Sequence, residues 1–305
     1  MGFDLVCIGD VTFDIISYPL RKYPVKDEQI SSEEPIKFQI GGGAAISACA
    51  ASNLGMKTCI FGKVGKDFAG TFLMEKILRN GVCSFLTHSN KETAKSIVIT
   101  FRDGSRSIIN FGGTNKELGI DDIDMEVVRN SENLLISGFF HLEKFQENCW
   151  KVLREAKKSG VTTYLDVPTL RTRKLTTLYK CFKSLDYLFV NEKELRIVTR
   201  EREWKKGLRK LAEKYGVKVV LHRGRKGSAY CEGGKIWSKK AYKVEPMNPT
   251  GAGDVFDSAF IFSTHKKFQI EERLKFAEAA ASIYLTNRKQ KFPNSREVRK
   301  FMEKF

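Results

Sequence analysis

Short apolar runs alternate with helical patterns along almost the whole chain, and this alternation restricts the possible folds more than any other feature of the sequence. The apolar runs have the length and character of buried strands, and they are FDLVCIGD (3–10), KTCIFGKVG (57–65), NLLISGFF (133–140), VTTYLDV (161–167), YLFVN (187–191) and VKVVLHRG (217–224). Helical patterns occupy residues 41–55, 67–81, 143–159 and 192–216. This order predicts an α/β fold with a doubly wound, mostly parallel sheet and helices on both faces.

Two stretches depart from this order and alternate with a period of two residues. The first covers about residues 12–40, and the second covers about residues 94–112 and turns at Asp103-Gly104, a strong hairpin signal. Because such strands do not join a parallel core easily, we expect a small antiparallel β lid on a single α/β domain that comprises residues 1–305. Strands at 95–111 inside the central sheet would contradict this expectation.

The composition is that of a globular protein with a positive field. The 305 residues carry a formal net charge of +17, and 42% of them are hydrophobic. Lys and Arg are interspersed with Glu in the helical patterns, so we expect a solvated surface and no specific nucleic-acid partner. A positive field nevertheless concentrates phosphates and acidic substrates near the protein. No apolar run approaches the roughly 20 residues that span a bilayer, and no basic segment precedes the first one, so we expect a cytoplasmic protein with no membrane partner.

Several common sites are not indicated by the sequence. The seven cysteines include no C-x-x-C pair, and the four histidines lack metal-ligand spacing. Neither a P-loop motif nor a G-x-G-x-x-G motif is present. His141, which follows a predicted strand, is interpreted as a structural residue, and a place in the lining of the substrate cleft is the alternative.

Polar and glycine residues follow the predicted strands. In α/β sheets, ligands bind beyond the carboxyl ends of the strands. We therefore expect one cleft to bring together Asp10, Gly41–Gly43, Asp166, Asn191 and Gly224.

The stretch NPTGAGDVFDSAF (248–260) has the features of an anion site at the start of a helix. If the helix begins near Asp254, the backbone N–H groups of Gly251, Ala252 and Gly253 are unpaired donors where the helix dipole also favours negative charge. Asp254 could then accept a proton from a hydroxyl that attacks a phosphate bound there. The alternative is that Asp254 only caps the helix and the glycines form a tight turn.

The same stretch resembles the C-terminal signature of the ribokinase or PfkB family of carbohydrate and nucleoside kinases, and GGGAAISACAASNLGMKTCIFGKVGKDFAG (41–70) resembles its N-terminal signature. The resemblance implies a β lid over the sugar, and ATP with Mg²⁺ as the phosphate donor. It also implies that Asp254 is the catalytic base and that Gly251, Ala252 and Gly253 form the anion hole.

On the substrate side, the resemblance implies that Asp14 binds hydroxyl groups and that Gly42 and Gly43 let the sugar approach the backbone. Asp10 and Ser47 are assigned to the same side. Ser47 stands where many members have an Asn, so the usual hydroxyl preference need not hold. The alternatives are a turn role for Asp14 and close packing at a helix start for the glycines.

On the nucleotide side, NEKE (191–194) resembles the family's N-x-x-E motif. It implies a role for Asn191 on the nucleotide and for Glu194 on Mg²⁺ through water. The same four residues also fit a helix-capping arrangement. Thr250 and the stretch HRGRKGSAY, with Arg223, Gly224 and Gly227, are assigned to the nucleotide site by the resemblance; a plain hairpin turn and a surface ion pair of Arg223 are the alternatives. Arg171, in DVPTLR, matches the family only loosely.

We therefore predict an ATP-dependent sugar kinase that transfers the γ-phosphoryl group to a hydroxyl of a small carbohydrate. A nucleoside kinase of the same family and a ligand-binding regulator without catalysis are the alternatives. A homodimer that pairs through the β lid is a further expectation.

Overall fold

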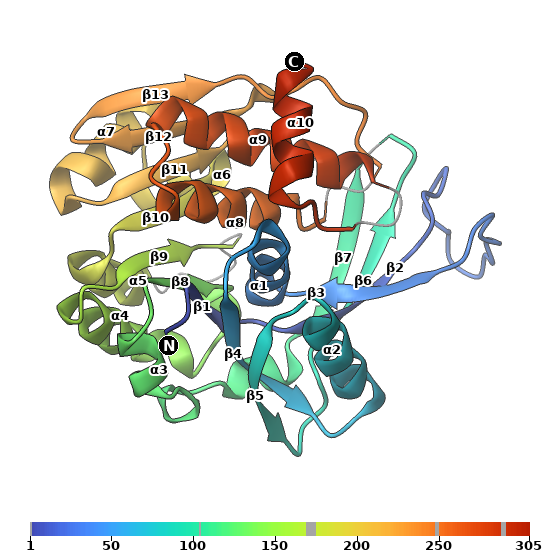
Figure 1. Ribbon diagram of the computed structural model, residues 1–305. Helices are drawn as coiled ribbons and strands as arrows, with labels where there is room; N and C mark the ends of the chain where they lie inside the picture. The colour runs from blue at the N-terminus through green and yellow to red at the C-terminus, as the bar shows by residue number, and fades with distance from the viewer. Residues whose placement is uncertain (1, 104, 169–174, 248–249, 288–290) are drawn as a thin grey trace.

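The computed structural model describes residues 2–103, 105–168, 175–247, 250–287 and 291–305. Its central sheet has the strand order β13-β12-β11-β10-β9-β8-β1-β4-β5 (Figure 1). The strands are β1 (Leu5–Gly9), β4 (Thr58–Gly65), β5 (Cys83–Ser89), β8 (Asn133–Ser137), β9 (Thr162–Asp166), β10 (Tyr187–Asn191), β11 (Lys218–His222), β12 (Ser228–Glu232) and β13 (Lys235–Lys239). All neighbours pair in parallel except β11 with β12 and β12 with β13, so the predicted doubly wound, mostly parallel sheet is confirmed.

Helices cover both faces of this sheet, because alternate strand residues point to opposite sides. Leu5 and Cys7 of β1 pack in one apolar cluster with α1, α2, α8, α9 and α10, whereas Val6 and Ile8 pack in a second cluster with α3 to α7. The helices are α1 (Gly43–Leu54), α2 (Phe68–Arg79), α3 (Met125–Arg129), α4 (Cys149–Lys158), α5 (Leu175–Cys181), α6 (Glu192–Thr199), α7 (Trp204–Tyr215), α8 (Ala252–His265), α9 (Ile270–Thr286) and α10 (Ser295–Glu303). None of them is long and apolar enough to cross a membrane, within the described residues.

Most predicted helices lie where the sequence placed them. α1 ends at Gly55, which adopts the left-handed conformation (φ 105°) expected of a terminating glycine. The pattern predicted at 143–159 becomes a helix only at Cys149. Its first part contains a short 3₁₀ turn at Phe145–Glu147. Another 3₁₀ turn, at Phe139–His141, precedes the predicted segment.

A separate four-stranded sheet has the order β3-β2-β6-β7 and projects from one side of the molecule (Figure 1). Its strands are β2 (Thr12–Ile16), β3 (Lys37–Gly41), β6 (Lys95–Thr100) and β7 (Arg106–Phe111). The predicted lid is thus a sheet of its own and not part of the central sheet. The β2–β3 and β6–β7 pairs are antiparallel, but β2 and β6 pair in parallel. Of the predicted hairpin turn, Gly104 lies outside the described residues.

The two faces of the lid differ in chemistry. In register, Asp14 lies beside Ser96 and Ser96 beside Asn110, while Arg106 lies beside Thr100, so these polar residues share one face. On the other face, Ile15 lies beside Ile97 and Phe38, and Ile97 lies beside Ile109. Ser96 and Asp14 are buried, whereas Ile97 and Ile109 are exposed. The polar face is therefore buried at Asp14 and Ser96, whereas the apolar face packs against α2 at Phe13 and is exposed at Ile97 and Ile109.

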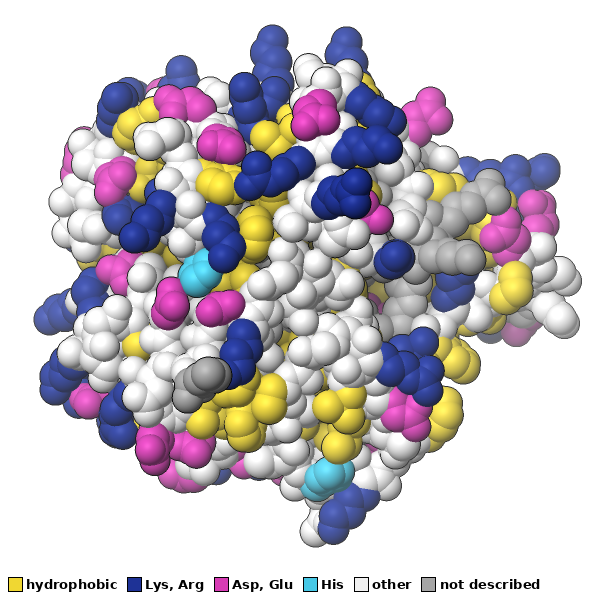
Figure 2. Space-filling view, in the orientation of Figure 1, with side chains coloured by type: hydrophobic (Ala, Val, Ile, Leu, Met, Phe, Trp, Pro, Cys, Tyr) yellow, Lys and Arg dark blue, Asp and Glu magenta, His cyan; other side chains and the backbone are white. Residues whose placement is uncertain are grey.

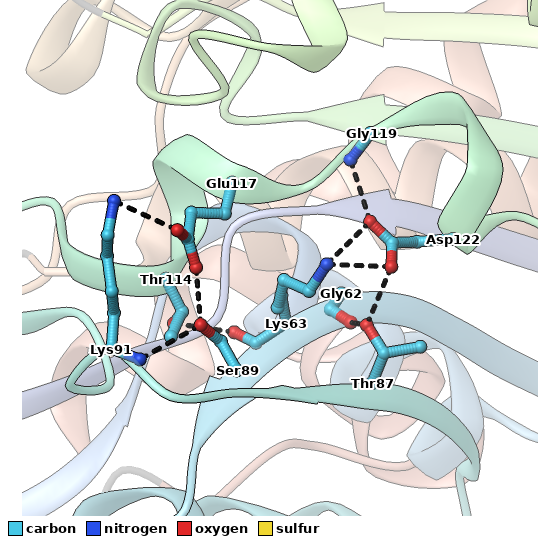
Figure 3. A network of polar contacts seen from close by, with 9 residues as sticks. All are labelled: Gly62, Lys63, Thr87, Ser89, Lys91, Thr114, Glu117, Gly119 and Asp122. Atoms are coloured by element: carbon cyan, nitrogen blue, oxygen red, sulfur yellow. Dashed lines mark hydrogen bonds and ion pairs between the residues drawn. The ribbon is translucent and has the colours of Figure 1, made fainter.

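A polar network fixes the base of the lid to the central sheet (Figure 3). Lys63 of β4 donates to both carboxylate oxygens of Asp122 (2.7 and 2.9 Å), and Asp122 also accepts from Thr87 of β5 (3.1 Å). The hydroxyl of Thr114 donates to the Lys63 carbonyl (2.8 Å). These contacts hold the 3₁₀ turn Gly113–Glu117, whose Asn115 accepts a hydrogen bond from the backbone N–H of Val11 (3.0 Å) at the entry to β2.

The positive charge is dispersed on the face of the molecule seen in Figure 2. Lys and Arg side chains are spread over that face and are interspersed with Asp and Glu. Many surface lysines form ion pairs with exposed carboxylates, such as Lys22 with Glu28 and Lys116 with Glu143. The +17 charge therefore produces a general positive field rather than a single basic stripe on this face.

Candidate active site

The residues of the predicted anion site, Gly251–Asp254, lie in the first turn of α8, which we call the anion turn. The helix begins at Ala252, two residues earlier than the start near Asp254 that the sequence suggested, and Gly251 precedes it with φ 83°. The first bond of the helix runs from the N–H of Val255 to the carbonyl of Gly251 (3.0 Å). The N–H groups from Gly251 to Asp254 therefore precede the helical bonding pattern, and Asp254 lies within the turn that carries them.

Two glycines bring α1 against this turn. A Cβ atom at Gly43 would lie 2.2 Å from Ser137 Oγ and 2.8 Å from Asp254 Oδ1, so the start of α1, the end of β8 and the start of α8 meet there. Gly42 has φ 87°, and a Cβ atom on it would lie 2.4 Å from the carbonyl oxygen of Asp10. Only glycine fits so close to the backbone of Asp10. The carboxylate of Asp254 thereby faces the N-terminus of α1.

Asp10 and Asp14 lie on the lid side of Asp254. Oδ1 of Asp10 accepts a hydrogen bond from the N–H of Ala44 (3.2 Å), and its Oδ2 is 3.1 Å from Nδ1 of His141. Burial, together with the negative charge of Asp10, raises the pKa of Asp14 to about 7, although a hydrogen bond with Ser96 opposes the shift. The predicted substrate residues Asp10 and Asp14 are therefore brought together.

Arg106 lies beside the predicted site residues and was not singled out by the sequence analysis. It lies on the polar face of the lid, and its Nη1 donates to the hydroxyl of Thr250 (3.0 Å), next to the anion turn. Burial lowers the pKa of Arg106, and the opposite charges of Asp254 and Asp14 oppose that shift. Its position in the strand could have indicated it, because Arg106 and the inward-facing Asn110 are separated by an even number of residues and so point to the same face.

Ser47 is not exposed to the cleft. Its side chain is buried between α1 and α8, where its hydroxyl donates to the carbonyl of Asp254 (3.4 Å) and its carbonyl accepts from the hydroxyl of Ser258 (2.9 Å). Its position gives no support to the predicted role as a sugar ligand. Instead, Ser47 helps to fix the first turn of α8.

Asn191 and Glu194 form a capping box at the start of α6, which is the alternative that the sequence left open. Oδ1 of Asn191 accepts from the N–H groups of Lys193 (2.9 Å) and Glu194 (3.0 Å), and Oε2 of Glu194 accepts from the N–H of Asn191 (2.7 Å). Burial and the charge of Asp166 raise the pKa of Glu194 to about 8. Within the described parts of the chain, no three His, Cys, Asp or Glu side chains are grouped as metal ligands. A cation beside this capping box would meet the single carboxylate of Glu194 and would have to keep most of its water shell.

The predicted nucleotide loop contains a hairpin between β11 and β12. Nε of Arg223 donates to Glu192 Oε1 (2.9 Å), and its guanidinium lies 4.2 Å from the centre of the Trp204 ring. The surface ion pair, left open as the alternative for Arg223, is thus what the structure contains. Gly224 (φ 53°) has open space around it, and Gly227 (φ 97°) lies against the carbonyl of Lys239. Arg171 lies outside the described residues.

A second cluster lies behind the anion turn, and the sequence analysis singled out only its Asp166. Nε2 of His222, at the end of β11, is 2.7 Å from Oδ1 of Asp257, which follows Asp254 by three residues in α8. At the end of β9, Oδ2 of Asp166 accepts from the hydroxyl of Ser137 (2.9 Å). Burial and the charges of Asp257 and Asp254 raise the pKa of Asp166 well above its usual range. The spacing of four histidines in the sequence could not indicate this pair, because its two members are 35 residues apart.

The raised pKa values of the buried carboxyl groups predict how the stability of the fold depends on pH. Burial raises the pKa of each member of a set around the site, which consists of Asp14, Asp166, Glu194, Asp254, Asp257 and Glu278. Between about pH 4 and pH 8 the folded state therefore holds more protons than the unfolded state, so the free energy of unfolding decreases as pH rises. We expect urea denaturation to give a free energy of unfolding at pH 8 that is lower than at pH 5 by about 2 kcal/mol or more.

The replacement Asp14→Asn is the control for this pH dependence. Because Asp14 has a pKa of about 7, its removal should make the decrease between pH 5 and pH 8 shallower. An increase in the free energy of unfolding over the same interval would contradict the assignment.

The chain matches a family model described as pfkB family carbohydrate kinase over residues 3–296. It is 32% identical to the ribokinase of Arabidopsis thaliana over 293 residues, which cover 92% of this chain and 75% of that protein. It is 26% identical to the 5-dehydro-2-deoxygluconokinase of Clostridium beijerinckii over 321 residues, covering 98% of this chain and 93% of that one.

Solved structures agree with the fold. The structure of the Arabidopsis thaliana ribokinase with ribose and ATP superimposes with a TM-score of 0.82 at 28% sequence identity, and covers 99% of both chains. The ribokinase of Thermotoga maritima superimposes with a TM-score of 0.83 at 24% identity, again over 99% of both chains. The second likeness concerns the fold alone.

Proposed function

The chain belongs to the pfkB family of carbohydrate kinases, and we propose that it transfers the γ-phosphoryl group of ATP to a hydroxyl group of a small sugar. The observation that carries the proposal is the junction at Gly43, where Asp254 Oδ1 and Ser137 Oγ stand within 3 Å of the position a Cβ atom would take. Asp254 therefore lies in the turn whose N–H groups precede the helical bonding pattern.

Asp254 is proposed as the base on the attacking hydroxyl. Burial and the charges of Asp257 and Asp10 raise the pKa of Asp254, whereas the charge of Arg106 opposes that shift. A carboxylate with a raised pKa is a better proton acceptor when it is ionised. The N–H groups of Gly251, Ala252 and Gly253 are proposed to stabilise the charge that develops on the transferred phosphoryl group.

The polar face of the lid is proposed to select the acceptor. Asp14 can accept hydrogen bonds from two hydroxyl groups, as a sugar requires. Arg106 adds a cation that could bind a carboxylate on a sugar acid or the transferred phosphate. Support for both acceptor classes comes from the relatives, one of which is named a ribokinase and the other a 5-dehydro-2-deoxygluconokinase. Ile16, Val98 and Ile108 lie on the same face of the lid, so closure would exclude water while the polar groups orient the acceptor.

The nucleotide is proposed to bind between the anion turn and the β11–β12 hairpin, beside Thr250, Gly224 and Gly227. When bound, Mg²⁺ would neutralise charge on the β- and γ-phosphates. Glu194 is proposed to act on this ion through water, because its carboxylate is buried and already accepts a hydrogen bond from Asn191. The side chains of Asn191 and Arg223 serve the helix cap and the Glu192 ion pair, so we assign neither to direct phosphate binding.

The test is ATP consumption with separate acceptors. Pentoses, hexoses, their acids, inositol and nucleosides are each supplied with ATP and Mg²⁺, and phosphorylated product is measured. Turnover with one sugar class supports the proposal and identifies the acceptor. Turnover with nucleosides alone selects a nucleoside kinase, and binding of ligands without turnover selects a regulator that lacks catalysis.

The lid is also proposed to form a homodimer interface on a single domain that comprises residues 1–305. Large apolar side chains are exposed on its outer face, with Ile97 44% and Ile109 62% exposed. Phe38 and Phe111 extend this surface. A second copy of the chain would bury these groups by pairing two lids, and contiguous exposed apolar surface of this kind marks interaction sites.

Replacing Ile109 with glutamate is expected to shift the protein from dimer to monomer, because two charges would be buried in a symmetric interface. Sedimentation velocity at micromolar concentration measures the change. The matched control is Leu78→Glu, since Leu78 is also exposed (56%) but lies on α2. Equal sedimentation of the Ile109 variant and the wild type would contradict the interface.

A further inference from the structure

A pocket rich in lysine lies beside the base of the lid. It has a volume of about 480 Å³, and its lining includes Lys63, Lys66, His88, Ser89, Lys116 and Lys144. The lysines come from β4, the turn after β4, the 3₁₀ turn Gly113–Glu117 and the segment between the 3₁₀ turns at Phe139–His141 and Phe145–Glu147. Among the described residues that line this basic pocket, none belongs to the candidate active site.

The polar network of Figure 3 gathers three of these lysines. Lys63 donates to both carboxylate oxygens of Asp122, and the N–H of Gly119 donates to Oδ2 of the same carboxylate (2.9 Å). Nζ of Lys144 lies against Gly119, because a Cβ atom there would be 2.9 Å from it. The backbone N–H of Lys144 also donates to the carbonyl of Lys116 (3.3 Å). Lys63, Lys116 and Lys144 are therefore held close together, although they are distant in the sequence.

The carboxylates near the pocket do not balance these lysines. Asp67, which follows Lys66 in the chain, pairs with a lysine of β6 (3.7 Å). Glu143, which precedes Lys144, pairs with Lys116 (2.8 Å). In the part of the chain that the structure describes, neither Lys66 nor Lys144 has a carboxylate within ion-pair distance. Two ammonium groups of one pocket thus lack an opposite charge there.

A pocket of this kind suits a small anion with more than one charge. Each ammonium group has three hydrogen-bond donors and binds phosphate as a point charge. The hydroxyl of Ser89 and the ring of His88 add polar groups to the same lining. The volume lies within the range of about 300 to 1,000 Å³ that is typical of small-molecule sites. The charge and the volume together point to a phosphorylated small molecule.

We propose that the basic pocket binds a small phosphate ester with two anionic groups, whose charge is neutralised mainly by Lys66 and Lys144. The site is separate from the anion turn, so the inference does not depend on the proposed kinase function.

The 3₁₀ turn Gly113–Glu117 connects the basic pocket with the lid. Lys116 lines the pocket, while the preceding Asn115 accepts from the backbone N–H of Val11 (3.0 Å) and donates to the hydroxyl of Thr12 (3.2 Å). An anion that holds Lys116 restrains this turn at the entry to β2, two residues before Asp14. Occupancy of the pocket should therefore slow the hydrogen exchange of residues 113–117.

The test measures binding in the absence of ATP and Mg²⁺. Fructose 1,6-bisphosphate and inorganic pyrophosphate are each titrated into the protein in a calorimeter, at about 0.15 M salt, which screens exposed charges beyond roughly 8 Å. We expect the double variant Lys66→Gln/Lys144→Gln to bind at least one of these probes about tenfold or more weakly than the wild type, because two charge-assisted contacts are lost. Failure of the wild type to bind either probe would overturn the inference.

A matched double variant separates the pocket from the general positive field. Lys275→Gln/Lys300→Gln removes the same two charges from exposed positions on α9 and α10 and should bind like the wild type. Equal weakening in the two double variants would mean that the +17 charge alone attracts the probe, and would contradict a site.

Hydrogen–deuterium exchange with the bound probe gives its location. Slower exchange at residues 113–117, absent in Lys66→Gln/Lys144→Gln, supports the basic pocket. Slower exchange at residues 251–254 alone would place the probe at the anion turn and overturn the inference, while leaving the proposed kinase intact.

Discussion

Asp254→Asn is expected to lower kcat by about 10³-fold and to leave the affinity for the non-hydrolysable ATP analogue AMP-PNP within a few-fold of the wild type. Asparagine has nearly the shape of aspartate but cannot accept the proton of the attacking hydroxyl, and a general base contributes roughly 10²- to 10⁴-fold. The backbone N–H groups of the anion turn are not altered by this change. The loss should therefore appear in kcat, measured with the acceptor that the substrate panel identifies.

The same variant has a second expected property. Because burial and two neighbouring carboxylates raise the pKa of Asp254, its ionised form is disfavoured in the folded protein. A neutral side chain removes this penalty, so Asp254→Asn should be at least as stable as the wild type at pH 8. Glu75→Gln, an exposed carboxylate-to-amide change on α2, is the control and should alter neither property. A kcat within tenfold of the wild type would exclude Asp254 as the base.

Gly42→Ala is expected to destabilise the fold by about 3 kcal/mol. The left-handed backbone at φ 87° costs a residue with a side chain roughly 1 to 2 kcal/mol. The added Cβ atom would also stand 2.4 Å from the backbone carbonyl of Asp10, which cannot move like a flexible side chain, and overpacking of this kind costs about 1 to 3 kcal/mol more. Urea denaturation at a fixed pH measures the total.

Gly55→Ala separates the two contributions. Gly55 also has a positive φ, 105°, but no atom lies within 4 Å of the position of its Cβ. We expect this variant to lose only the backbone part, about 1 kcal/mol. Equal losses in the two variants would mean that the approach of Gly42 to Asp10 is not a tight contact.

The alternation of strands and helices predicts the central sheet well because each strand is a separate apolar run with its own turn signals. The lid could be predicted as a separate sheet because its strands alternate polar and apolar residues. A strand with one polar face does not fit a sheet that helices cover on both sides. The parallel pairing of β2 with β6 was not predictable. A period of two residues indicates which side chains share a face, but it carries no information about which strand lies alongside.

The place of the candidate site could be predicted where backbone geometry determines it, and less well where side-chain contacts determine it. The glycines at 42 and 43 and the turn before Asp254 can be recognised because few other residues tolerate such positions. Ser47 and Arg223 have types suited to ligands, yet each already has a partner within the chain. Arg106 and His222 were missed because their roles arise from contacts with segments distant in sequence, which local spacing does not encode.

The two sheets differ in how well their strands are protected against local opening. Residues 13–16 of β2 pair with residues 95–98 of β6, and β3, α1, β4, α2 and β5 lie between these partners in the chain. β7 forms one edge of the lid and most of its residues are exposed, whereas every residue of β1 is buried in the central sheet. Few buried contacts lower the free energy of local opening, so amide hydrogens of β7 should exchange before those of β1.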